Sequence, residues 1–376
     1  ARPKHLPYGF EARFRRADGA WRWMRIAVNP RFDANGVFKG YVGMSFDVTD
    51  TREAIEALAR QERRQSFLLA LTDSLRDLSS PDDIMAGRLP QGRVLLFDCG
   101  EGTQFRLQAA GLSRSRVEAI FVTHFHGDHF YGLIGLVSTM ALLGRTEPLT
   151  LVGPAGLAAA LDAVPGLYPN DLSFPLAFVE LEEGFTHCVV FETADFSVAA
   201  RPIEHRVFCA GYRFEERPRP GSLDVERARA LGVTDYHDYP RLKSGEAVTL
   251  SDGRVVRPEE VVGPEKPGVV FAYVTDTRPC EGGRLLAEGA DLVYHEATFG
   301  DAYRENALET AHSTAREAAE VARAAGARHL LLGHFSARYA DPAPLVEEAR
   351  EVFQNTEAAE ELKRYVPEAR PPGAAQ

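Results

Sequence analysis

The sequence is poor in cysteine, and its few cysteines are not grouped. The four of them, Cys99, Cys188, Cys209 and Cys280, are scattered, and no two form a C-x-x-C pair. This spacing excludes a disulfide framework and a zinc knuckle built on thiolates. Scattered single cysteines are typical of a protein that folds in a reducing interior.

Long apolar runs are also lacking. No stretch reaches the ~18 apolar residues that a membrane-spanning helix requires, and no signal-peptide pattern opens the chain. We therefore expect a cytoplasmic protein with no membrane partner. The chain begins with Ala1 rather than Met, and we expect this to be a cut or processed end.

Positive charge is in deficit, because the formal net charge is −11. Indiscriminate nucleic-acid binding is mostly an attraction between cations and phosphates, so this balance argues against it. Binding through a local basic segment, or through the charge of a bound metal, stays open.

The first part of the chain has a strand-like pattern followed by a helical one. Apolar residues alternate from residue 8 to residue 50, and the turn dipeptides Asp-Gly and Asn-Gly interrupt them, which predicts three antiparallel strands. Residues 51–86 include a run with helical spacing, for which Thr51 is a suitable N-cap. We expect a β-segment over residues 1–50 and a helical linker over residues 51–86.

From residue 87 to residue 376, apolar strand-like runs alternate with helical patterns. Buried strands are predicted at RVLLFDCG, VEAIFV, PLTLVGP, VVFAYV, ADLVYH and RHLLLG, and helices at AGLAAALDAV and TAREAAEVARAAGA. Strands followed by helices in this order predict a layered α/β domain with its helices outside the sheets.

The densest chemistry lies in the stretch FVTHFHGDHFYG, which contains His124, His126, Asp128 and His129. Such side chains would be costly to bury unpaired, and their nitrogen and oxygen atoms suit Zn²⁺ or a similar divalent ion. Gly127 is expected to permit a tight turn. We predict that His124 and His126 point at one cation, and Asp128 and His129 at a second.

Three later residues supply the ligands that one loop cannot. His205, Asp276 and His334 each follow a strand-like run, so they can meet at one edge of a sheet sandwich. Asp276 is predicted to bridge two ions, because a carboxylate has two oxygens to share. The expected ligand sets are His124, His126 and His205 for one ion, and Asp128, His129 and His334 for the other. We expect two Zn²⁺ per subunit, with Mn²⁺ and Mg²⁺ as alternatives.

The motifs around these ligands resemble the ribonuclease Z family of the metallo-β-lactamase superfamily over about residues 90–368. In order, they are FDCGEGTQ, the H-x-H-x-D-H cluster, FAYVTDTR, HEATF, AHSTA and HFSARY. The cluster alone indicates only the superfamily, whereas the other motifs are more specific. The resemblance implies the αββα sandwich of the metallo-β-lactamase fold. It also implies a zinc-dependent endoribonuclease that removes the 3′ trailer from precursor tRNA and leaves a 3′-hydroxyl.

The resemblance further implies catalytic roles. Asp128 would accept a proton from the attacking water, His312 in AHSTA would donate one to the leaving oxygen, and Glu296 in HEATF would orient His312. Plainer explanations exist for the last two. His312 lies next to Thr314 and Glu317, which are spaced as a capping box, and Glu296 could be purely structural.

An inserted segment is the expected substrate arm. Residues 217–254 are long and punctuated by proline and glycine, and long loops inside compact domains are usually functional or disordered. The resemblance implies that this arm grips the tRNA elbow, often on the partner subunit of a homodimer. Arg241 and Lys243 in the arm, and Arg338 in SARY, are the candidate substrate-binding residues. A solvated loop is the alternative for the arm, and a salt bridge for Arg338.

Residues 5–65 resemble the C-terminal half of a PAS sensor domain. The resemblance rests on the hairpin FRRADGAWRWMRI and on GYVGMSFDVTDTREAIEAL. An accessory β-element with no ligand explains the same segment.

The ribonuclease Z resemblance lacks its usual beginning. We find no counterpart of the family's first strands, of its glycine-rich turn or of its arginine–asparagine segment before Arg93. An incomplete sheet would leave an unpaired edge, so we expect lower stability or activity than in a complete relative. The alternative functions are another metallo-β-lactamase-fold phosphodiesterase or hydrolase, and a PAS-type sensory fusion with an inactive catalytic domain.

Overall fold

The structure is a computed structural model that describes residues 8–17, 21–49, 85–88, 92–164, 167 and 172–367. The chain divides into two compact units, Ala1–Ser80 and Pro81–Gln376. Within the described ranges we find no helix with the length and apolar character needed to cross a membrane.

The first unit contains the three antiparallel strands that the sequence predicts. They pair in the order β1-β2-β3 and are β1 (Tyr8–Arg15), β2 (Trp21–Phe32) and β3 (Phe38–Asp47). In the second turn, the Asp33 carboxylate accepts hydrogen bonds from the backbone N–H groups of Asn35 and Val37, and Gly36 has a φ of 77°. The helical linker expected over residues 51–86 lies outside the described residues, apart from its last two positions.

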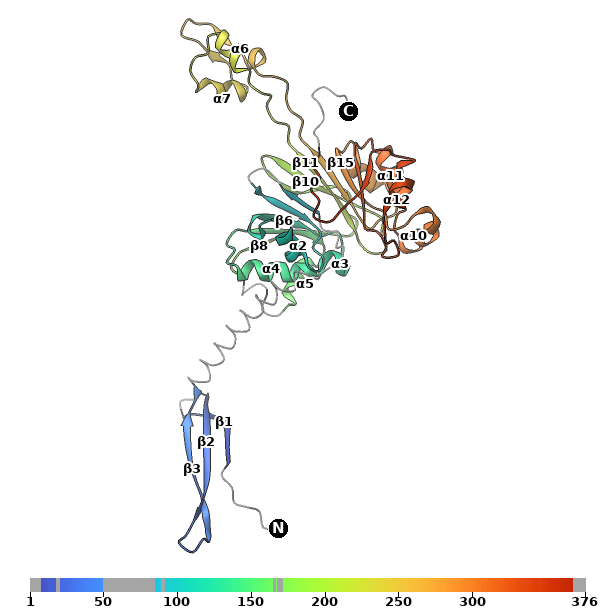
Figure 1. Ribbon diagram of the computed structural model, residues 1–376. Helices are drawn as coiled ribbons and strands as arrows, with labels where there is room; N and C mark the ends of the chain where they lie inside the picture. The colour runs from blue at the N-terminus through green and yellow to red at the C-terminus, as the bar shows by residue number, and fades with distance from the viewer. Residues whose placement is uncertain are drawn as a thin grey trace. The chain divides into compact units, whose positions relative to one another are not determined.

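The second unit is built on two β-sheets (Figure 1). The five-stranded sheet has the order β4-β5-β6-β7-β8, with β4 (Met85–Arg88), β5 (Val94–Phe97), β6 (Val117–Phe121), β7 (Leu149–Pro154) and β8 (Leu176–Leu181). The seven-stranded sheet has the order β17-β16-β15-β14-β11-β10-β9, with β9 (Cys188–Glu192), β10 (Phe196–Pro202), β11 (Ala210–Glu216), β14 (Val270–Val274), β15 (Leu292–Glu296), β16 (Leu330–Gly333) and β17 (Thr356–Ala358).

Helices cover the outer face of each sheet. Beside the five-stranded sheet lie α2 (Thr103–Ala109), η3 (Arg114–Arg116), α3 (Gly127–Phe130), α4 (Gly132–Leu142) and α5 (Leu157–Asp162). Beside the seven-stranded sheet lie α9 (Glu281–Ala287), η4 (Asp301–Tyr303), α10 (Arg304–Thr310), α11 (Ala315–Ala324) and α12 (Ala343–Arg350). The four layers form the αββα sandwich that the family resemblance implies.

β5 and β16 have no polar side chain and are buried along their whole length, as expected of strands covered on both faces. In β5, Leu95 and Phe97 belong to the core between the sheets, whereas Leu96 packs toward the helices. The core between the sheets is rich in aromatic rings. Phe97 stacks on Phe121 with ring centroids 5.1 Å apart, and its ring lies 5.6 Å from that of Tyr273 in the other sheet.

The edge of the five-stranded sheet is a short strand. Met85–Arg88 forms β4, which pairs antiparallel with β5 along its full length. β4 is the end strand of this sheet among the described residues, so the expectation of an unpaired edge stays a prediction. A four-residue run containing a glycine carries little strand propensity of its own, and the neighbouring strand makes it a strand.

An arm leaves the second unit after β11 and returns at β14. Its stem carries the antiparallel bridges Arg219–Lys266 and Leu223–Val262, and α6 and α7 lie at its far end (Figure 1). Its elements are α6 (Val225–Ala230), α7 (Asp238–Lys243), β12 (Val248–Thr249), β13 (Val255–Val256) and α8 (Pro258–Val261). They bury a small core of their own, formed by Ala228, Val233, Leu242, Val248, Val256 and Val261. The insertion therefore extends to residue 269, beyond the expected limit of 254, because β13 and α8 complete this core.

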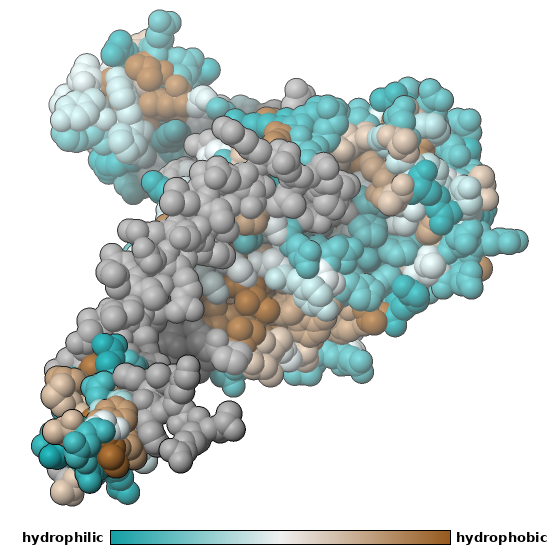
Figure 2. Space-filling view, turned by 60° about the horizontal axis from the view of Figure 1, so that its bottom comes forward, coloured by the Kyte–Doolittle hydropathy of each residue, from teal (hydrophilic) through white to brown (hydrophobic). Residues whose placement is uncertain are grey.

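The surface of the second unit is largely hydrophilic on the face that Figure 2 shows. This agrees with the net charge of −11. The first unit is different, because Phe14, Trp21 and Met44 on its three strands are each about half exposed.

Gly132, at the start of α4, generates a prediction about stability. A methyl group there would lie 1.6 Å from the carbonyl oxygen of Gly100, so backbone would have to move. We expect Gly132→Ala to lower the free energy of unfolding by about 3 kcal/mol, measured by urea denaturation of the full chain. Gly263→Ala is the control, because its nearest atom would lie at 3.5 Å. Equal stability of the two variants would contradict this packing argument.

Candidate metal centre and active site

The H-x-H-x-D-H loop lies directly after β6 and leads into α3. His124 and His129 are fully buried, whereas the Asp128 side chain is 57% exposed. The loop therefore presents the imidazoles of His124 and His129 in the interior, that of His126 at a partly buried position, and one carboxylate at the surface.

Gly127 serves this loop differently from our expectation. Its φ is not among the positive values of the chain, so no left-handed turn requires glycine here. A Cβ at Gly127 would instead lie 2.8 Å from the Tyr131 ring. A larger residue at position 127 would therefore have to displace the ring of Tyr131, which is 58% exposed.

The three later residues also follow strands, as predicted. His205 comes after β10, Asp276 after β14 and His334 after β16. β14 and β16 are both parallel neighbours of β15, so their carboxyl ends meet at one edge, where sites in such sheets form. Asp276 and His334 have φ values of 49° and 53°. Left-handed backbone at non-glycine residues is strained and is concentrated at functional sites.

One donor group consists of three imidazoles and one oxygen of Asp276. Nε2 of His124 lies 2.9 Å from Nδ1 of His126 and 3.5 Å from Oδ2 of Asp276. Nε2 of His205 lies 3.8 Å from the same oxygen. Bonds of ~2.1 Å in a tetrahedral zinc site place ligand atoms about 3.4 Å apart, so these separations are close to those of such a site.

A second donor group uses the other oxygen of Asp276. Oδ1 lies 3.5 Å from Nε2 of His129 and 3.2 Å from Nε2 of His334. Oδ2 of Asp128 lies 3.5 and 3.7 Å from the same two nitrogens. The structure thus brings all seven predicted ligands together, with Asp276 between the two groups.

The electrostatics of the site favour the metal-binding protonation states of His124 and of the two carboxylates. Burial, aided by the charge of His129, lowers the pKa of His124 to about 2, so His124 is a neutral imidazole. Burial by itself would raise the pKa of Asp276, but His334, His129 and His124 outweigh it and the pKa is lowered. Hydrogen bonds from His129 and His334 lower the pKa of Asp128. Neutral imidazoles and ionised carboxylates are the ligand forms. Burial by itself would lower the pKa of His129, but the neighbouring carboxylates, Asp98 foremost, outweigh it and the pKa is raised. His129 therefore has to lose a proton when it binds a metal.

Two buried nitrogens test whether a cation fits. Nε2 of His129 and Nε2 of His205 have no hydrogen-bond partner among the described residues. A buried polar atom without a partner is destabilising. Both atoms lie within 3.8 Å of a carboxylate oxygen of Asp276, where divalent cations would satisfy them. The donors are imidazole nitrogen and carboxylate oxygen, so the residues present fit such ions.

Asp98 is a functional residue that the sequence reasoning missed. It is fully buried, and its carboxylate accepts from Nδ1 of His129 at 2.8 Å and from the Tyr273 hydroxyl at 3.1 Å. It also binds the backbone N–H and hydroxyl of Thr123, whose Oγ1 lies 2.9 Å from Nδ1 of His124. Asp98 therefore orients one ligand of each group, and such support is what metal sites require. The sequence contains the same signal that identified Asp276 and His334, because Asp98 is a polar residue that follows a buried strand.

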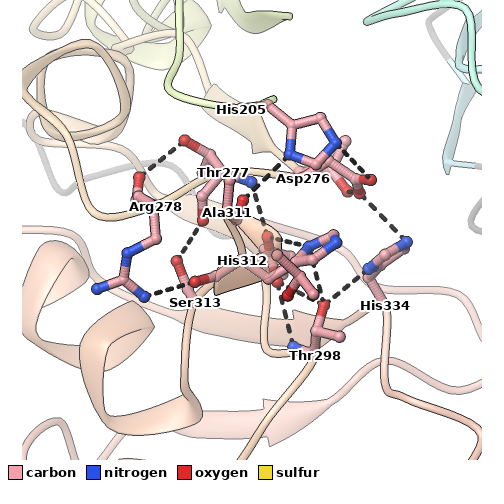
Figure 3. A network of polar contacts seen from close by, with 12 residues as sticks. His205, Asp276, Thr277, Arg278, Thr298, Ala311, His312, Ser313 and His334 are labelled. Atoms are coloured by element: carbon pink, nitrogen blue, oxygen red, sulfur yellow. Dashed lines mark hydrogen bonds and ion pairs between the residues drawn. The ribbon is translucent and has the colours of Figure 1, made fainter. Parts of the chain in front are cut away.

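Glu296 and His312 form a buried pair beside the second group. Oε1 of Glu296 lies 2.8 Å from Nδ1 of His312, and because an ionised carboxylate only accepts, Nδ1 is the donor. Burial alone would raise the pKa of Glu296, but the hydrogen bond from His312 outweighs it and the pKa is lowered. Ligand atoms of His312, Asp276 and His334 lie within 4.8 Å of one another. Figure 3 shows His312 facing this site.

Thr298 links the pair to a metal-ligand candidate, and the sequence did not single it out. Its hydroxyl donates to Oε2 of Glu296 at 2.6 Å. Oγ1 then accepts from Nδ1 of His334 at 2.9 Å (Figure 3). Nδ1 of His334 therefore carries a proton, which leaves Nε2 to face Asp276.

The three candidate substrate-binding residues have different surroundings. The Arg338 guanidinium lies 4.4 Å from the ring centroid of Tyr303 and 4.9 Å from that of Phe299, and no carboxylate pairs with it among the described residues. Arg241 is paired with two carboxylates on the arm. Lys243 is exposed and has no carboxylate partner in the described part of the chain.

Comparison with known proteins places these features in a family. Residues 88–275 match the family model of the metallo-beta-lactamase superfamily. The ribonuclease Z of Salinibacter ruber is 61% identical over 276 residues, which are 73% of this chain and 86% of that protein. The ribonuclease Z of Bacillus licheniformis is 44% identical over 268 residues, or 71% of this chain and 86% of that protein.

A solved structure agrees. The crystal structure of human tRNase Z, short form, aligns with a TM-score of 0.55 at 26% identity, covering 78% of this chain and 96% of that one. The PAS resemblance of residues 5–65 is not supported by these matches and stays a prediction. Divalent-metal binding follows from the superfamily fold together with the two donor groups. The identity to two ribonucleases Z over most of both chains makes this protein a member of the ribonuclease Z family of the metallo-β-lactamase superfamily.

Proposed function

We propose that this protein is a metal-dependent endoribonuclease that removes the 3′ trailer from precursor tRNA and leaves a 3′-hydroxyl on the tRNA. One observation carries the proposal. Two donor groups share the Asp276 carboxylate in a chain that is 61% identical to a ribonuclease Z. A shared carboxylate suits the two-metal sites that act on phosphodiesters.

The ligands would be divided between the two groups as their geometry suggests. Each subunit would hold two Zn²⁺, with Mn²⁺ and Mg²⁺ as alternatives. The ligands of one ion would be His124, His126 and His205, and those of the other Asp128, His129 and His334. Asp276 would be shared by both ions. When bound, the ions would lower the pKa of a water molecule and offset the charge of the phosphate.

Asp128 is the proposed proton acceptor. Its Oδ2 faces His129 and His334, which leaves Oδ1 to receive a proton from the attacking water. Its partial exposure, 57%, supports this role because substrate and water must reach it. In-line attack forms the new P–O bond as the bond to the 3′ oxygen breaks.

His312 is the proposed donor to that leaving oxygen. Its Nδ1–H is held by Glu296, so the other ring nitrogen carries the proton that is transferred. The Glu296 carboxylate holds the ring of His312 in one orientation, as the buried carboxylate of a catalytic triad does for its histidine. After transfer the tRNA carries a 3′-hydroxyl and the trailer keeps the phosphate.

Substrate phosphates would be bound at two places. Stacking on Tyr303 and Phe299 fixes the Arg338 guanidinium without neutralising it, which favours phosphate binding over a salt bridge. On the arm, Lys243 is the stronger candidate, because Asp238 and Glu246 already pair with Arg241.

Three further features rest on the sequence and its resemblances alone. The homodimer, the cytoplasmic location and the PAS-like character of the first unit stay predictions. An inactive catalytic domain is disfavoured, because seven metal-capable side chains would have no reason to converge.

The shared carboxylate is tested by Asp276→Asn, which keeps the shape but loses the charge. We expect metal content to fall from about two ions per chain by at least one, measured by elemental analysis. Cleavage of a 3′-extended precursor tRNA should fall by more than the about 10–100-fold typical of changes that only support a ligand. Asp162→Asn, an exposed carboxylate at the end of α5, is the matched control. Full metal content and activity in Asp276→Asn would refute the shared site.

The proton donor is tested by His312→Ala with two substrates. We expect kcat on precursor tRNA to fall about 10²–10⁴-fold, the usual contribution of a positioned acid. Hydrolysis of bis(p-nitrophenyl) phosphate should fall far less, because nitrophenolate leaves without a proton. His329→Ala is the control, since His329 also pairs with a glutamate, at 2.9 Å. The same loss on both substrates would rule out the donor role.

The arm is tested by removing it at its stem. Arg219 and Lys266 face each other across an antiparallel bridge, so an Asn-Gly turn can replace residues 220–265. We expect this variant to lose precursor-tRNA cleavage and to retain hydrolysis of bis(p-nitrophenyl) phosphate. Unchanged tRNA cleavage would show that the arm does not bind substrate, and would favour the alternative of a general phosphodiesterase.

A further inference from the structure

The segment that carries His312 is held in an unusual backbone conformation. Ala311 ends α10 with a φ of 58° and a ψ of 45°, which costs about 1–3 kcal/mol for a residue with a Cβ. Its carbonyl oxygen accepts a hydrogen bond from Nδ1 of His205 at 3.1 Å. The hydroxyl of Ser313 donates to the carbonyl of Thr277 at 2.5 Å (Figure 3). Other contacts must hold such a segment in place.

Arg278 makes the strongest of these contacts. Its Nη1 donates to the carbonyl oxygen of His312 at 2.5 Å and to Oε2 of Glu317 at 2.8 Å. Its Nη2 donates to Oε1 of Glu317 at 2.6 Å. The two side chains are only 15% and 6% exposed, so water screens this bidentate pair little. Figure 3 shows the guanidinium directed at the His312 segment.

Glu317 connects Arg278 to the helix that follows His312. It is the third residue of α11, where its carboxylate accepts from the backbone N–H of Thr314 at 2.9 Å and completes a capping box. Nε of Arg304 lies 3.5 Å from the same carboxylate. The guanidinium of Arg278 therefore fixes both ends of the short stretch from His312 to the first turn of α11.

The backbone of Arg278 reaches the metal ligands as well. Its N–H donates to the carbonyl of Glu204 at 2.8 Å, one residue before His205. Asp276 lies two residues before Arg278. One arginine thus joins three segments that end at the site, those of His205, Asp276 and His312.

We propose that Arg278 is a positioning residue that holds His312 at the distance from the metal ligands at which it can donate a proton. This inference rests on the proposed function. Arginine is required because its planar fork binds both oxygens of Glu317 and still reaches the His312 carbonyl, which a lysine ammonium cannot do with the same geometry. Arg278 does not touch the substrate and acts through His312.

The experiment compares Arg278→Ala, Arg278→Lys and the control Arg284→Ala. Arg284 also pairs with a glutamate, Glu281, but on the exposed side of α9. For Arg278→Ala we expect kcat on precursor tRNA to fall about 10–100-fold, because a misplaced acid loses much of its effect. KM should stay within about twofold of the value for the unaltered protein, because the contacts that bind the substrate before the reaction are unchanged. Hydrolysis of bis(p-nitrophenyl) phosphate should fall by a much smaller factor, and Arg278→Lys should recover little of the loss.

A double-mutant cycle separates positioning from general damage. If Arg278 acts through His312, Arg278→Ala should add little to the loss already caused by His312→Ala. Metal content and the thermal unfolding midpoint are measured for every variant, and we expect metal content to stay unchanged. Additive losses, equal losses on both substrates, or loss of metal would overturn the proposal. If Arg278→Ala does not fold, Arg278→Lys carries the same comparison.

The design also distinguishes failure of the proposed function. If the unaltered protein hydrolyses a dinucleotide but does not cut precursor tRNA, the tRNA assignment fails. The Arg278 inference is then tested on the dinucleotide, whose alkoxide leaving group also needs a proton. If Arg278→Ala loses more activity on the dinucleotide than on the nitrophenyl ester, the positioning role of Arg278 is supported. Equal losses of activity on the two substrates would overturn it.

Discussion

The site depends on a buried carboxylate, that of Asp276, which is shared by two groups of imidazoles. Its two oxygens face different sets of nitrogens at 3.2–3.8 Å. Burial opposes its negative charge, and the surrounding imidazoles more than compensate. Such a concentration of polar groups is stable only if cations or hydrogen bonds satisfy each atom. The rest of the sandwich can be understood as a rigid frame that holds these atoms at fixed separations.

The sandwich places its functional residues at strand ends, and hydrogen bonds from neighbouring buried residues fix their orientation. Asp98, Asp276 and His334 all have left-handed backbone conformations directly after strands. Asp98 supports His129, and Thr298 supports His334. These hydrogen bonds determine which ring nitrogen of each histidine carries a proton, and so which one can bind a metal. Such backbone strain persists only where the surrounding structure fixes the conformation, and here the buried strands before each residue do so.

Recognition and chemistry are divided between parts of the chain that have separate cores. The arm buries its own small cluster of apolar side chains. It joins the rest of the second unit through a stem of two antiparallel segments of the chain. In the proposed function, the arm would bind the body of the tRNA while Arg338 binds near the cleaved bond. A protein of net charge −11 can recognise RNA in this way, because local cations and metal charge replace a general basic surface.

The sequence by itself determined the layered α/β character of the second unit, six of its strands (β5, β6, β7, β14, β15 and β16) and the seven side chains that the structure brings together. These properties depend on local patterns, because apolar periodicity marks strands and a polar residue after a strand marks a site at its end. Tertiary structure decided the rest. β4 is a strand because β5 lies beside it, and the arm extends to residue 269 because β13 and α8 complete its core. The Tyr131 ring packs against the backbone at Gly127. Arg278 meets Glu317 across 39 positions of sequence. Contacts between residues so far apart leave no periodic signal, because the folded backbone alone brings them together.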